Sequence, residues 1–143
     1  YETICSGSPA GPDFDGVAGV QVHMTNTRLT DPEVLELRYP VVLDEFSIVR
    51  GSGGRGRHCA GDGTRRALRF LEPMHAAILS GYRELAPPGL EGGEDGNCGC
   101  NFVERGNGCG EKLSGCEETE LAAGDRIIVE TPTGGGFGRV RNE

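Results

Sequence analysis

The side chains best suited to chemistry gather at residues 23–28. His23, Thr25, Asn26, Thr27 and Arg28 supply an imidazole, two hydroxyls, an amide and a guanidinium within six positions. Such groups can bind a carboxylate or an amide, and a guanidinium can do so through two parallel hydrogen bonds. We therefore take these five residues as candidate substrate-binding groups. The sequence shows no metal-ligand pair at helical spacing and no Walker loop, so we assign no catalytic residue.

Each candidate also has a purely structural interpretation. His23 lies on the polar face of an alternating pattern whose apolar members are Val20, Val22 and Met24, where neighbouring backbone could satisfy its ring. The Asn and Thr side chains could instead cap the turn that follows them. In both interpretations, residues 25–28 lie between the end of a strand and the start of a helix.

Six cysteines form a second group with chemical potential. Cys5 and Cys59 are isolated, and the other four lie within 19 residues: Cys98, Cys100, Cys109 and Cys116. Four thiolates could hold zinc, although Cys98-Gly99-Cys100 lacks the two-residue spacing usual in structural zinc loops. Reduced thiols in loops and disulfides are the alternatives.

One short helix is predicted near residues 31–38. Thr30 stands three residues before Glu33 in a capping-box arrangement, and Pro32 occupies one of the first helical positions, where a missing N–H costs nothing. Pro40 disfavours a helical conformation at Tyr39, so the helix should end there.

The remaining pattern predicts a mainly β chain, although it leaves open whether the strands form a barrel or a sandwich. Glycine accounts for 25 of 143 residues, more than twice the roughly 7% usual in proteins, and clusters between short β-rich segments. We expect one domain over residues 1–143 with a wrapping loop at 1–18 and an exposed Gly/Cys-rich insert at 89–116. Strands are predicted at 41–43 and 46–49 (or one bent strand), 65–71, 76–79, 101–104 and 126–130.

The glycine-dense stretch at residues 51–56 has two interpretations. Its backbone N–H groups could converge on an anion, as in a phosphate cradle. It lacks the Gly-Lys-Ser/Thr ending of a nucleotide-binding loop, so a turn that needs positive φ values is the alternative.

Charge and hydropathy exclude some partners. The net charge of −8 argues against sequence-independent binding to nucleic acid, which depends on phosphate neutralisation. No apolar run approaches the roughly 18 residues that span a membrane. Six arginines lie between Arg50 and Arg69, either as solvated strand residues or facing an anionic ligand or acidic partner.

Several motifs together resemble the C-terminal end of the hydantoinase B / ATP-dependent 5-oxoprolinase family. They are YETI at 1–4, HMTNTRLTDPEVLELRYP at 23–40, GSGGRGR at 51–57, GDG at 61–63, RFLEP at 69–73 and TPTGGGFG at 131–138. Their order covers essentially the whole chain, and LTDPE at 29–33 is similar to the 5-oxoprolinase type within the family. The cysteine cluster is not a family feature.

The resemblance implies a larger enzyme of glutathione metabolism that opens 5-oxo-L-proline, a small cyclic amide, to L-glutamate with hydrolysis of ATP. ATP and a divalent metal would bind in the rest of that hydantoinase A/B-like enzyme, and these residues would supply scaffold and part of the active-site wall. The chain begins with Tyr1, so we expect a piece of a longer polypeptide in a cytoplasmic oligomer. The alternatives are a non-catalytic assembly subunit, or the equivalent segment of a hydantoinase or an ATP-dependent ketone carboxylase.

Overall fold

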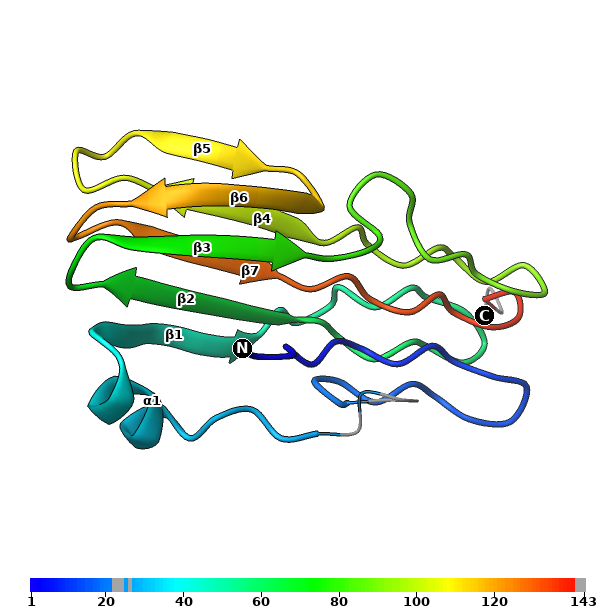
Figure 1. Cartoon of the computed structure of the whole chain (residues 1–143). Coiled ribbons are helices and arrows are strands. Elements are labelled where there is room, and N and C mark those ends of the chain that lie inside the picture. The colour runs from blue at the N-terminus through cyan, green and yellow to red at the C-terminus, as the bar shows by residue number, and fades with distance from the viewer. Residues whose placement is uncertain (22–24, 26, 141–143) are drawn as a thin grey trace.

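The computed structural model describes residues 1–21, 25 and 27–140, and its regular structure is mainly strand (Figure 1). The mainly β prediction is therefore confirmed. The elements are α1 (Pro32–Arg38), β1 (Val41–Ile48), β2 (Thr64–Phe70), β3 (Met74–Leu79), β4 (Cys100–Glu104), β5 (Gly110–Leu113), β6 (Cys116–Leu121) and β7 (Arg126–Glu130).

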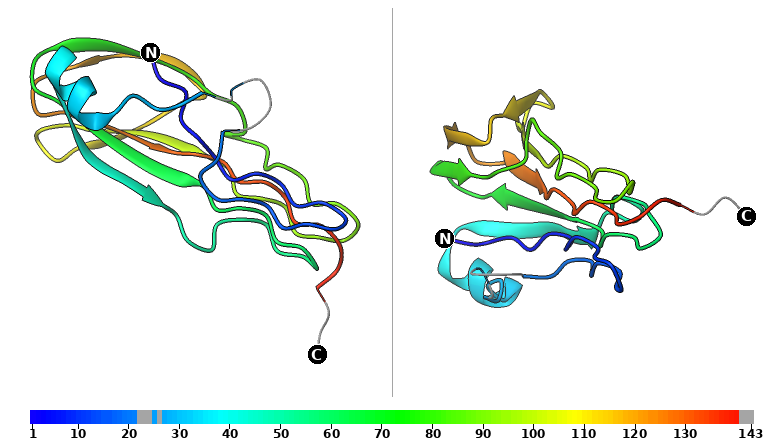
Figure 2. Two further views of the ribbon diagram at one scale, coloured as in Figure 1. Left: turned by 90° about the horizontal axis from the view of Figure 1, so that it is seen from below. Right: turned by 90° about the vertical axis from the view of Figure 1, so that its right-hand side faces the viewer.

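The strands form two antiparallel sheets that pack face to face. The larger sheet has the order β1-β2-β7-β4-β5, and β3 pairs with β6 in a separate two-stranded sheet. β1 and β5 lie at opposite edges of the larger sheet, so this sheet is open and does not close into a barrel. Because the two sheets face each other across a common core, the architecture is a sandwich. The smaller sheet covers only part of the larger one (Figures 1 and 2).

The core lies between the sheets and is closed at one end by α1. Its buried members come from the helix and from both sheets, and they are Leu35, Val41, Phe70, Val103, Leu113, Leu121 and Ile127. Three side chains of β3, those of Met74, Ala76 and Ile78, pack against this cluster. The exposed residues of β3 alternate with them, as expected for a strand with one buried face. The strand predicted at 76–79 is therefore present within β3, but only one of its faces is buried.

The helix forms where it was predicted, but its cap differs. Asp31, and not Thr30, is the N-cap, and its carboxylate accepts hydrogen bonds from the N–H groups of Glu33 and Val34. Pro32 is the first helical residue and Tyr39 is extended, as the sequence predicted. The helix buries Leu35 alone. No helix within the described residues is long and apolar enough to cross a membrane.

Beyond the sandwich, four glycine-rich segments run alongside one another with little regular structure (Figure 2). They span residues 5–20, 51–63, 87–97 and 131–138. We call this half of the molecule the glycine bundle. Its segments are joined by backbone hydrogen bonds: the N–H of Ala10 donates to the carbonyl of Gly135 at 3.1 Å, and the N–H of Gly54 to that of Gly134 at 3.1 Å.

Glycine is required in this bundle because the backbones nearly touch. A Cβ added to Gly136 would lie less than 3.0 Å from the carbonyl of Arg55, and one added to Gly61 would meet the backbone of Val17 equally closely. Real Cβ atoms essentially never approach backbone so closely. The high glycine content thus serves close packing in addition to turns.

The segment at 89–116 is not a single exposed insert. Cys98, Cys109 and Cys116 are exposed, but β4 and β5 belong to the larger sheet, and Val103 and Leu113 lie in the core. β5 and β6 were not predicted, since their sequences GEKL and CEETEL contain little apolar alternation. The segments predicted at 41–43 and 46–49 belong to one strand, β1, which ends at Ile48 and has a register shift between Leu43 and Glu45.

We predict that Gly136→Ala lowers the free energy of unfolding by about 3 kcal/mol or more, because an added methyl group must push two backbones apart. Thermal unfolding followed by circular dichroism measures the change. Gly81→Ala is the matched control, since nothing lies within 4 Å of a Cβ at Gly81. Similar stability of the two variants would show that the bundle tolerates wider spacing.

Candidate functional site

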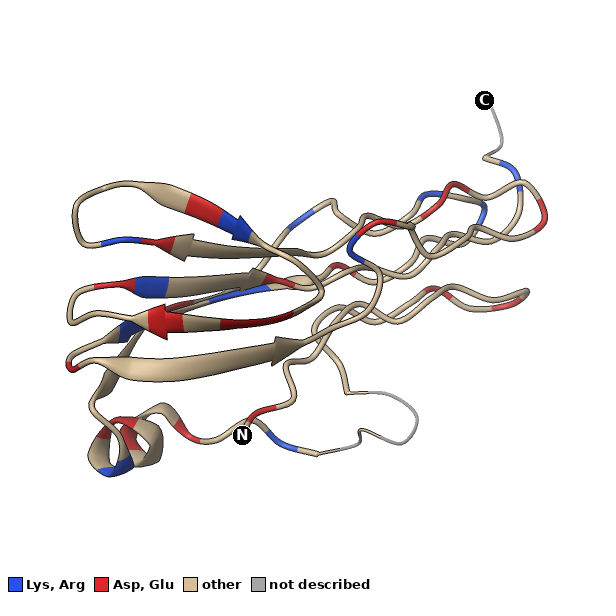
Figure 3. Cartoon of the chain, turned by 45° about the horizontal axis from the view of Figure 1, so that its top comes forward, with Lys and Arg blue, Asp and Glu red and all other residues tan. Residues whose placement is uncertain are grey.

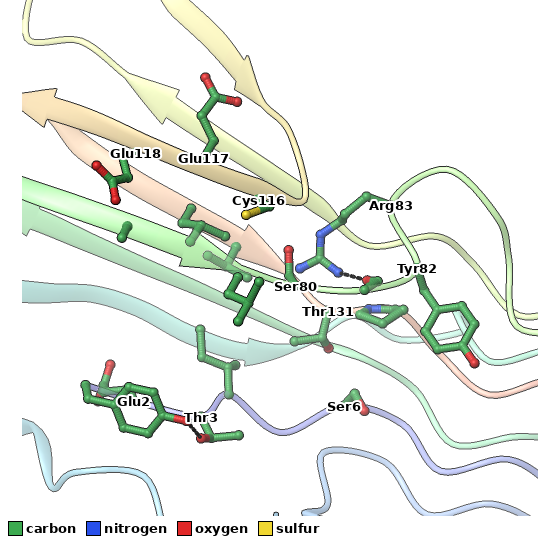
Figure 4. Close-up of a pocket in the computed structure, with 18 residues that line it drawn as sticks. Glu2, Thr3, Ser6, Ser80, Tyr82, Arg83, Cys116, Glu117, Glu118 and Thr131 are labelled. Carbon is green, nitrogen blue, oxygen red and sulfur yellow. Dashed lines mark hydrogen bonds between the residues drawn. The ribbon is translucent and has the colours of Figure 1, made fainter.

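A cavity of about 860 Å³ opens where the smaller sheet stops covering the larger one (Figure 4). It lies between the N-terminal segment on one side and the ends of β3 and β6 on the other, and the end of β7 also lines it. Its lining residues are 1–4 and 6, 77–83, 116–118, 129, 131 and 132. This volume is within the range of small-molecule and peptide sites.

The N-terminal wall of the cavity is held by a largely buried ion pair. The guanidinium of Arg66, on the inner face of β2, donates to both carboxylate oxygens of Glu2 at 3.1 and 2.7 Å. The Arg66 side chain is 2% exposed and stacks on the ring of Phe46, whose centroid lies 5.3 Å away. The hydroxyl of Thr64 donates to the carbonyl of Cys5 at 2.6 Å. These contacts fix residues 2–5 above β2.

A polar cluster holds the opposite wall. Asn101 is fully buried, and its side-chain oxygen accepts from Nε and Nη2 of Arg83 at 3.1 and 2.9 Å. Its amide nitrogen donates to Ser80 Oγ at 2.9 Å and to the carbonyl of Ser114 at 3.0 Å. Arg83 also donates from Nη1 to the carbonyl of Gly81 at 2.7 Å. All hydrogen-bonding groups of the Asn101 side chain are therefore satisfied within the protein.

The cavity lining combines apolar surface with polar and charged side chains. Burial lowers the pKa of Arg83, and the nearby sulfur groups of Cys100 and Cys98 offset this only in part. A guanidinium is not deprotonated in proteins near neutral pH. The lining contains no histidine, and its serine at position 80 is engaged by Asn101 and the Gly115 carbonyl. Ser6, Cys116 and Thr131 add further polar side chains to the lining.

The predicted binding residues lie elsewhere in the chain. His23 and Asn26 fall outside the described residues. Thr25, Thr27 and Arg28 are exposed on the connection that leads to α1, and the Thr27 hydroxyl donates to the carbonyl of Thr25 at 3.1 Å. None of these three lines the cavity. Their role in substrate binding stays a prediction.

Sequence reasoning missed the residues that build the cavity. Arg83 stands alone in a loop and Asn101 sits inside a strand, so neither belongs to a local motif. Their meeting depends on the packing of the 80–83 loop on β4, which no short-range pattern encodes.

The cysteines do not come together as a metal centre. Cys98 and Cys100 flank Gly99, Cys109 precedes β5, and Cys116 begins β6. All six cysteines are free thiols. Across residues 1–21, 25 and 27–140, no three or more His, Cys, Asp or Glu side chains are grouped so that they could hold a metal ion. The zinc interpretation of the cluster thus finds no fitting donor set in this conformation.

The glycine-rich loop at 51–56 is occupied by a carboxylate of the protein itself. The side chain of Asp62 accepts a hydrogen bond from the N–H of Gly53 at 3.0 Å. Burial by itself raises the pKa of Asp62, but the N–H groups of Gly53, Gly51 and Ser52 outweigh it and hold the pKa below the usual 3.8. Gly51 has a φ of +73°, so the loop is a positive-φ turn. Its anion-binding capacity is used internally.

The arginines of β2 are likewise paired within the chain. Arg65 bridges Glu45 and Glu130, and Arg69 pairs with Asp44 at 2.9 Å. Charges of both signs are interspersed on these strands (Figure 3). Hydrogen bonds from Arg69 lower the pKa of Asp44 more than burial raises it. The solvated-strand interpretation therefore fits Arg65 and Arg69, each of which already has a carboxylate partner.

The comparisons with known proteins agree with the fold. The family model described as hydantoinase B/oxoprolinase matches residues 1–140, so this chain belongs to the hydantoinase B/oxoprolinase family. Among its relatives, the 5-oxoprolinase of Dictyostelium discoideum is 47% identical over 97% of this chain, and the 5-oxoprolinase 1 of Arabidopsis thaliana is 46% identical over 96%. The chain spans only 11% of the length of each.

Two solved structures share the fold. The ATP-dependent caprolactamase from Pseudomonas jessenii aligns over 94% of this chain and 24% of its own, with a TM-score of 0.76 and 24% identity. A nucleotide-free acetone carboxylase aligns over 94% and 22%, with a TM-score of 0.74 and 16% identity. At these identities the likeness concerns the fold alone.

We predict that Glu2→Ala lowers the free energy of unfolding by about 3 kcal/mol, because it leaves the buried guanidinium of Arg66 without its carboxylate. Chemical denaturation at pH 7 measures this loss. Glu72→Ala removes an exposed carboxylate between β2 and β3 and should leave stability nearly unchanged. If both variants unfold alike, the ion pair does not anchor the N-terminal segment.

We predict that Asp62→Asn costs about 2 kcal/mol at pH 7 through weaker hydrogen bonds from the loop N–H groups. A carboxyl whose pKa is lowered by folding stabilises the protein above its ordinary pKa of 3.8, and this contribution is lost as the pH falls through the lower folded-state pKa. Stability should therefore fall less steeply in acid for the variant than for the parent chain.

Urea titrations between neutral and acidic pH test this slope. Asp13→Asn, at an exposed position of the same glycine-rich half, serves as the control and should keep the parent slope. A parent-like slope for Asp62→Asn would contradict the assignment of Asp62 as the internal anion.

Proposed function

We propose that this chain is part of an ATP-dependent 5-oxoprolinase, which converts 5-oxo-L-proline, ATP and water to L-glutamate, ADP and phosphate. The observation that carries the proposal is the 46–47% identity to two 5-oxoprolinases across nearly the whole chain. By contrast, the identity to the caprolactamase subunit beta of Pseudomonas jessenii is 33%. The residue pattern thus favours the oxoprolinase type among the family's activities.

Within that enzyme, these residues act as a structural scaffold and form part of the wall of the active site. Opening a lactam with ATP requires a nucleotide site, a divalent metal and a base that aims water. We place ATP and metal in the remaining part of the enzyme, since this chain corresponds to only 11% of its relatives. Residues Thr25, Thr27 and Arg28 are exposed and therefore accessible to a substrate held by another part. His23 and Asn26 complete this proposed substrate-facing run.

The same proposal extends to the cellular setting. We infer a cytoplasmic oligomer that acts in glutathione metabolism, with the remainder of the hydantoinase A/B-like enzyme as the partner and a small cyclic amide as the substrate. An assembly role without any substrate contact is the second candidate. The open cavity and the edge of β3, which is unpaired among the described residues, favour this second candidate.

A segment exchange tests the proposal. The matching stretch of the Dictyostelium discoideum 5-oxoprolinase is replaced by these 143 residues, and glutamate formation and ADP release are measured with 5-oxo-L-proline. We expect most of the activity to be retained, because a stretch that is 47% identical should present similar surfaces to the rest of the enzyme.

The control exchange inserts the corresponding stretch of the caprolactamase subunit beta. This stretch shares the fold but fewer residues, so activity should fall strongly. Loss of activity with both inserts, in a soluble enzyme of normal size, would contradict the proposed oxoprolinase type. Activity of the isolated 143-residue chain would contradict the proposal that ATP and metal bind in the rest of the enzyme.

A further inference from the structure

The cavity borders an unpaired strand edge. Within the described ranges, β3 pairs only with β6. The N–H of Ser80 donates to the carbonyl of Gly115, so these two residues form a hydrogen-bonded antiparallel pair. Because such pairs alternate along a ladder, the N–H and C=O groups of Ala77 and Leu79 point away from β6. They face the side on which the cavity lies.

The opposite side of the cavity is also an extended backbone. Residues 2–5 run across from β3, separated from it by the cavity (Figure 4). The floor is the larger sheet, with Val129 and Thr131 among the lining residues. The smaller layer of the sandwich therefore has an opening between β3 and the N-terminal segment.

The size of this opening suits a short strand. A residue in a sheet occupies roughly 160 Å³, from about 3.3 Å of rise, 4.8 Å of strand spacing and 10 Å of sheet spacing. A cavity of about 860 Å³ thus accommodates an extended segment of roughly five residues.

Charge indicates what kind of segment fits. Among the charged lining residues there are three carboxylates, on Glu2, Glu117 and Glu118, against one guanidinium, on Arg83. Glu2 is already paired with Arg66. Glu117 lies opposite Ile78 on the inner face of β6 and accepts a hydrogen bond from the N–H of Ser114. Glu118 lies on the outer face, where its side chain is 73% exposed and 3.5 Å from the imidazole of His75. The surplus acidic charge near the start of β6 favours a basic residue in the occupant.

We propose that this opening binds an extended segment from the rest of the enzyme, which adds to the free edge of β3 as a further strand. The segment has alternating apolar residues that pack on the floor and, on its opposite face, a Lys or Arg that meets Glu118. Backbone hydrogen bonds to Ala77 and Leu79 supply its register. The source of the segment rests on the proposed function, since about nine-tenths of each relative lies outside the matched stretch.

A peptide titration tests the site on the 143-residue chain. The probe is the blocked peptide Lys-Val-Thr-Val-Thr, and binding is followed by backbone amide chemical shifts. The amides of Ala77 and Leu79 should move most, and a peptide with Glu in place of Lys should bind more weakly.

Two proline variants distinguish the loss of pairing at the edge of β3 from a general disturbance of the fold. Ala77→Pro removes an outward N–H beside the cavity without breaking the ladder to β6, and proline is tolerated at strand edges. We expect it to weaken peptide binding about tenfold. His75→Pro removes an equivalent outward N–H on the same strand, outside the cavity lining. Because the ring of His75 lies 3.5 Å from the carboxylate of Glu118, His75→Pro is compared with His75→Ala, and these two variants should bind the peptide equally. A dispersed amide spectrum verifies that each variant folds.

Hydrogen exchange tests the source of the segment. Backbone amides of residues 74–80 should exchange more slowly in the segment-exchanged 5-oxoprolinase than in the isolated chain. Unchanged exchange would overturn the assignment to the rest of the enzyme. This measurement requires no turnover, so an inactive exchanged enzyme would count against the proposed function and leave this result intact.

The remaining outcomes all overturn the site as proposed. They are absence of peptide binding, equal binding by the Ala77→Pro and parent chains, displacement of the peptide by 5-oxo-L-proline, and dimerisation of the chain through β3 in sedimentation. The third would indicate a small-molecule site and the fourth a surface for a second copy.

Discussion

The close approach of backbone segments in the glycine bundle is the constraint on which the rest of the structure depends. Gly136 and Gly61 each lie against carbonyl groups of another segment with no space for a side chain. The segments are then near enough for direct hydrogen bonds, such as that from Ala10 to Gly135. This arrangement satisfies backbone groups without regular sheet structure, and it connects the two ends of the chain because residues 5–20 and 131–138 meet there.

Several charged side chains are likewise paired within the chain. Asp62 supplies its own loop with an anion, Glu2 neutralises the buried Arg66, and Asp44 pairs with Arg69. The positive charges of Arg65, Arg66 and Arg69 are therefore engaged within the fold. Within the described residues, backbone and apolar groups remain open at the cavity and at the edge of β3.

These open surfaces fit a chain that works as part of something larger. The sandwich has a core, but its smaller layer has only two strands and leaves part of the larger sheet to the N-terminal segment. The caprolactamase and acetone carboxylase structures embed the same fold in chains about four times longer. A scaffold that receives a strand from its surroundings would be attached firmly to the rest of the enzyme.

The sequence by itself determined the mainly β character, the helix at 31–38, most strand positions and the family, because hydrophobic alternation, proline placement and short motifs are local signals. Only the tertiary structure decided that the sheets form a sandwich, that Asp31 caps the helix, that GEKL and CEETEL are strands, and that Arg83 and Asn101 meet beside a cavity. Those features depend on contacts between residues far apart in the chain, such as the pairing of β7 with β2 and β4. The glycines show the division well: their number was visible in the sequence, but the partner that each backbone approaches was set by packing.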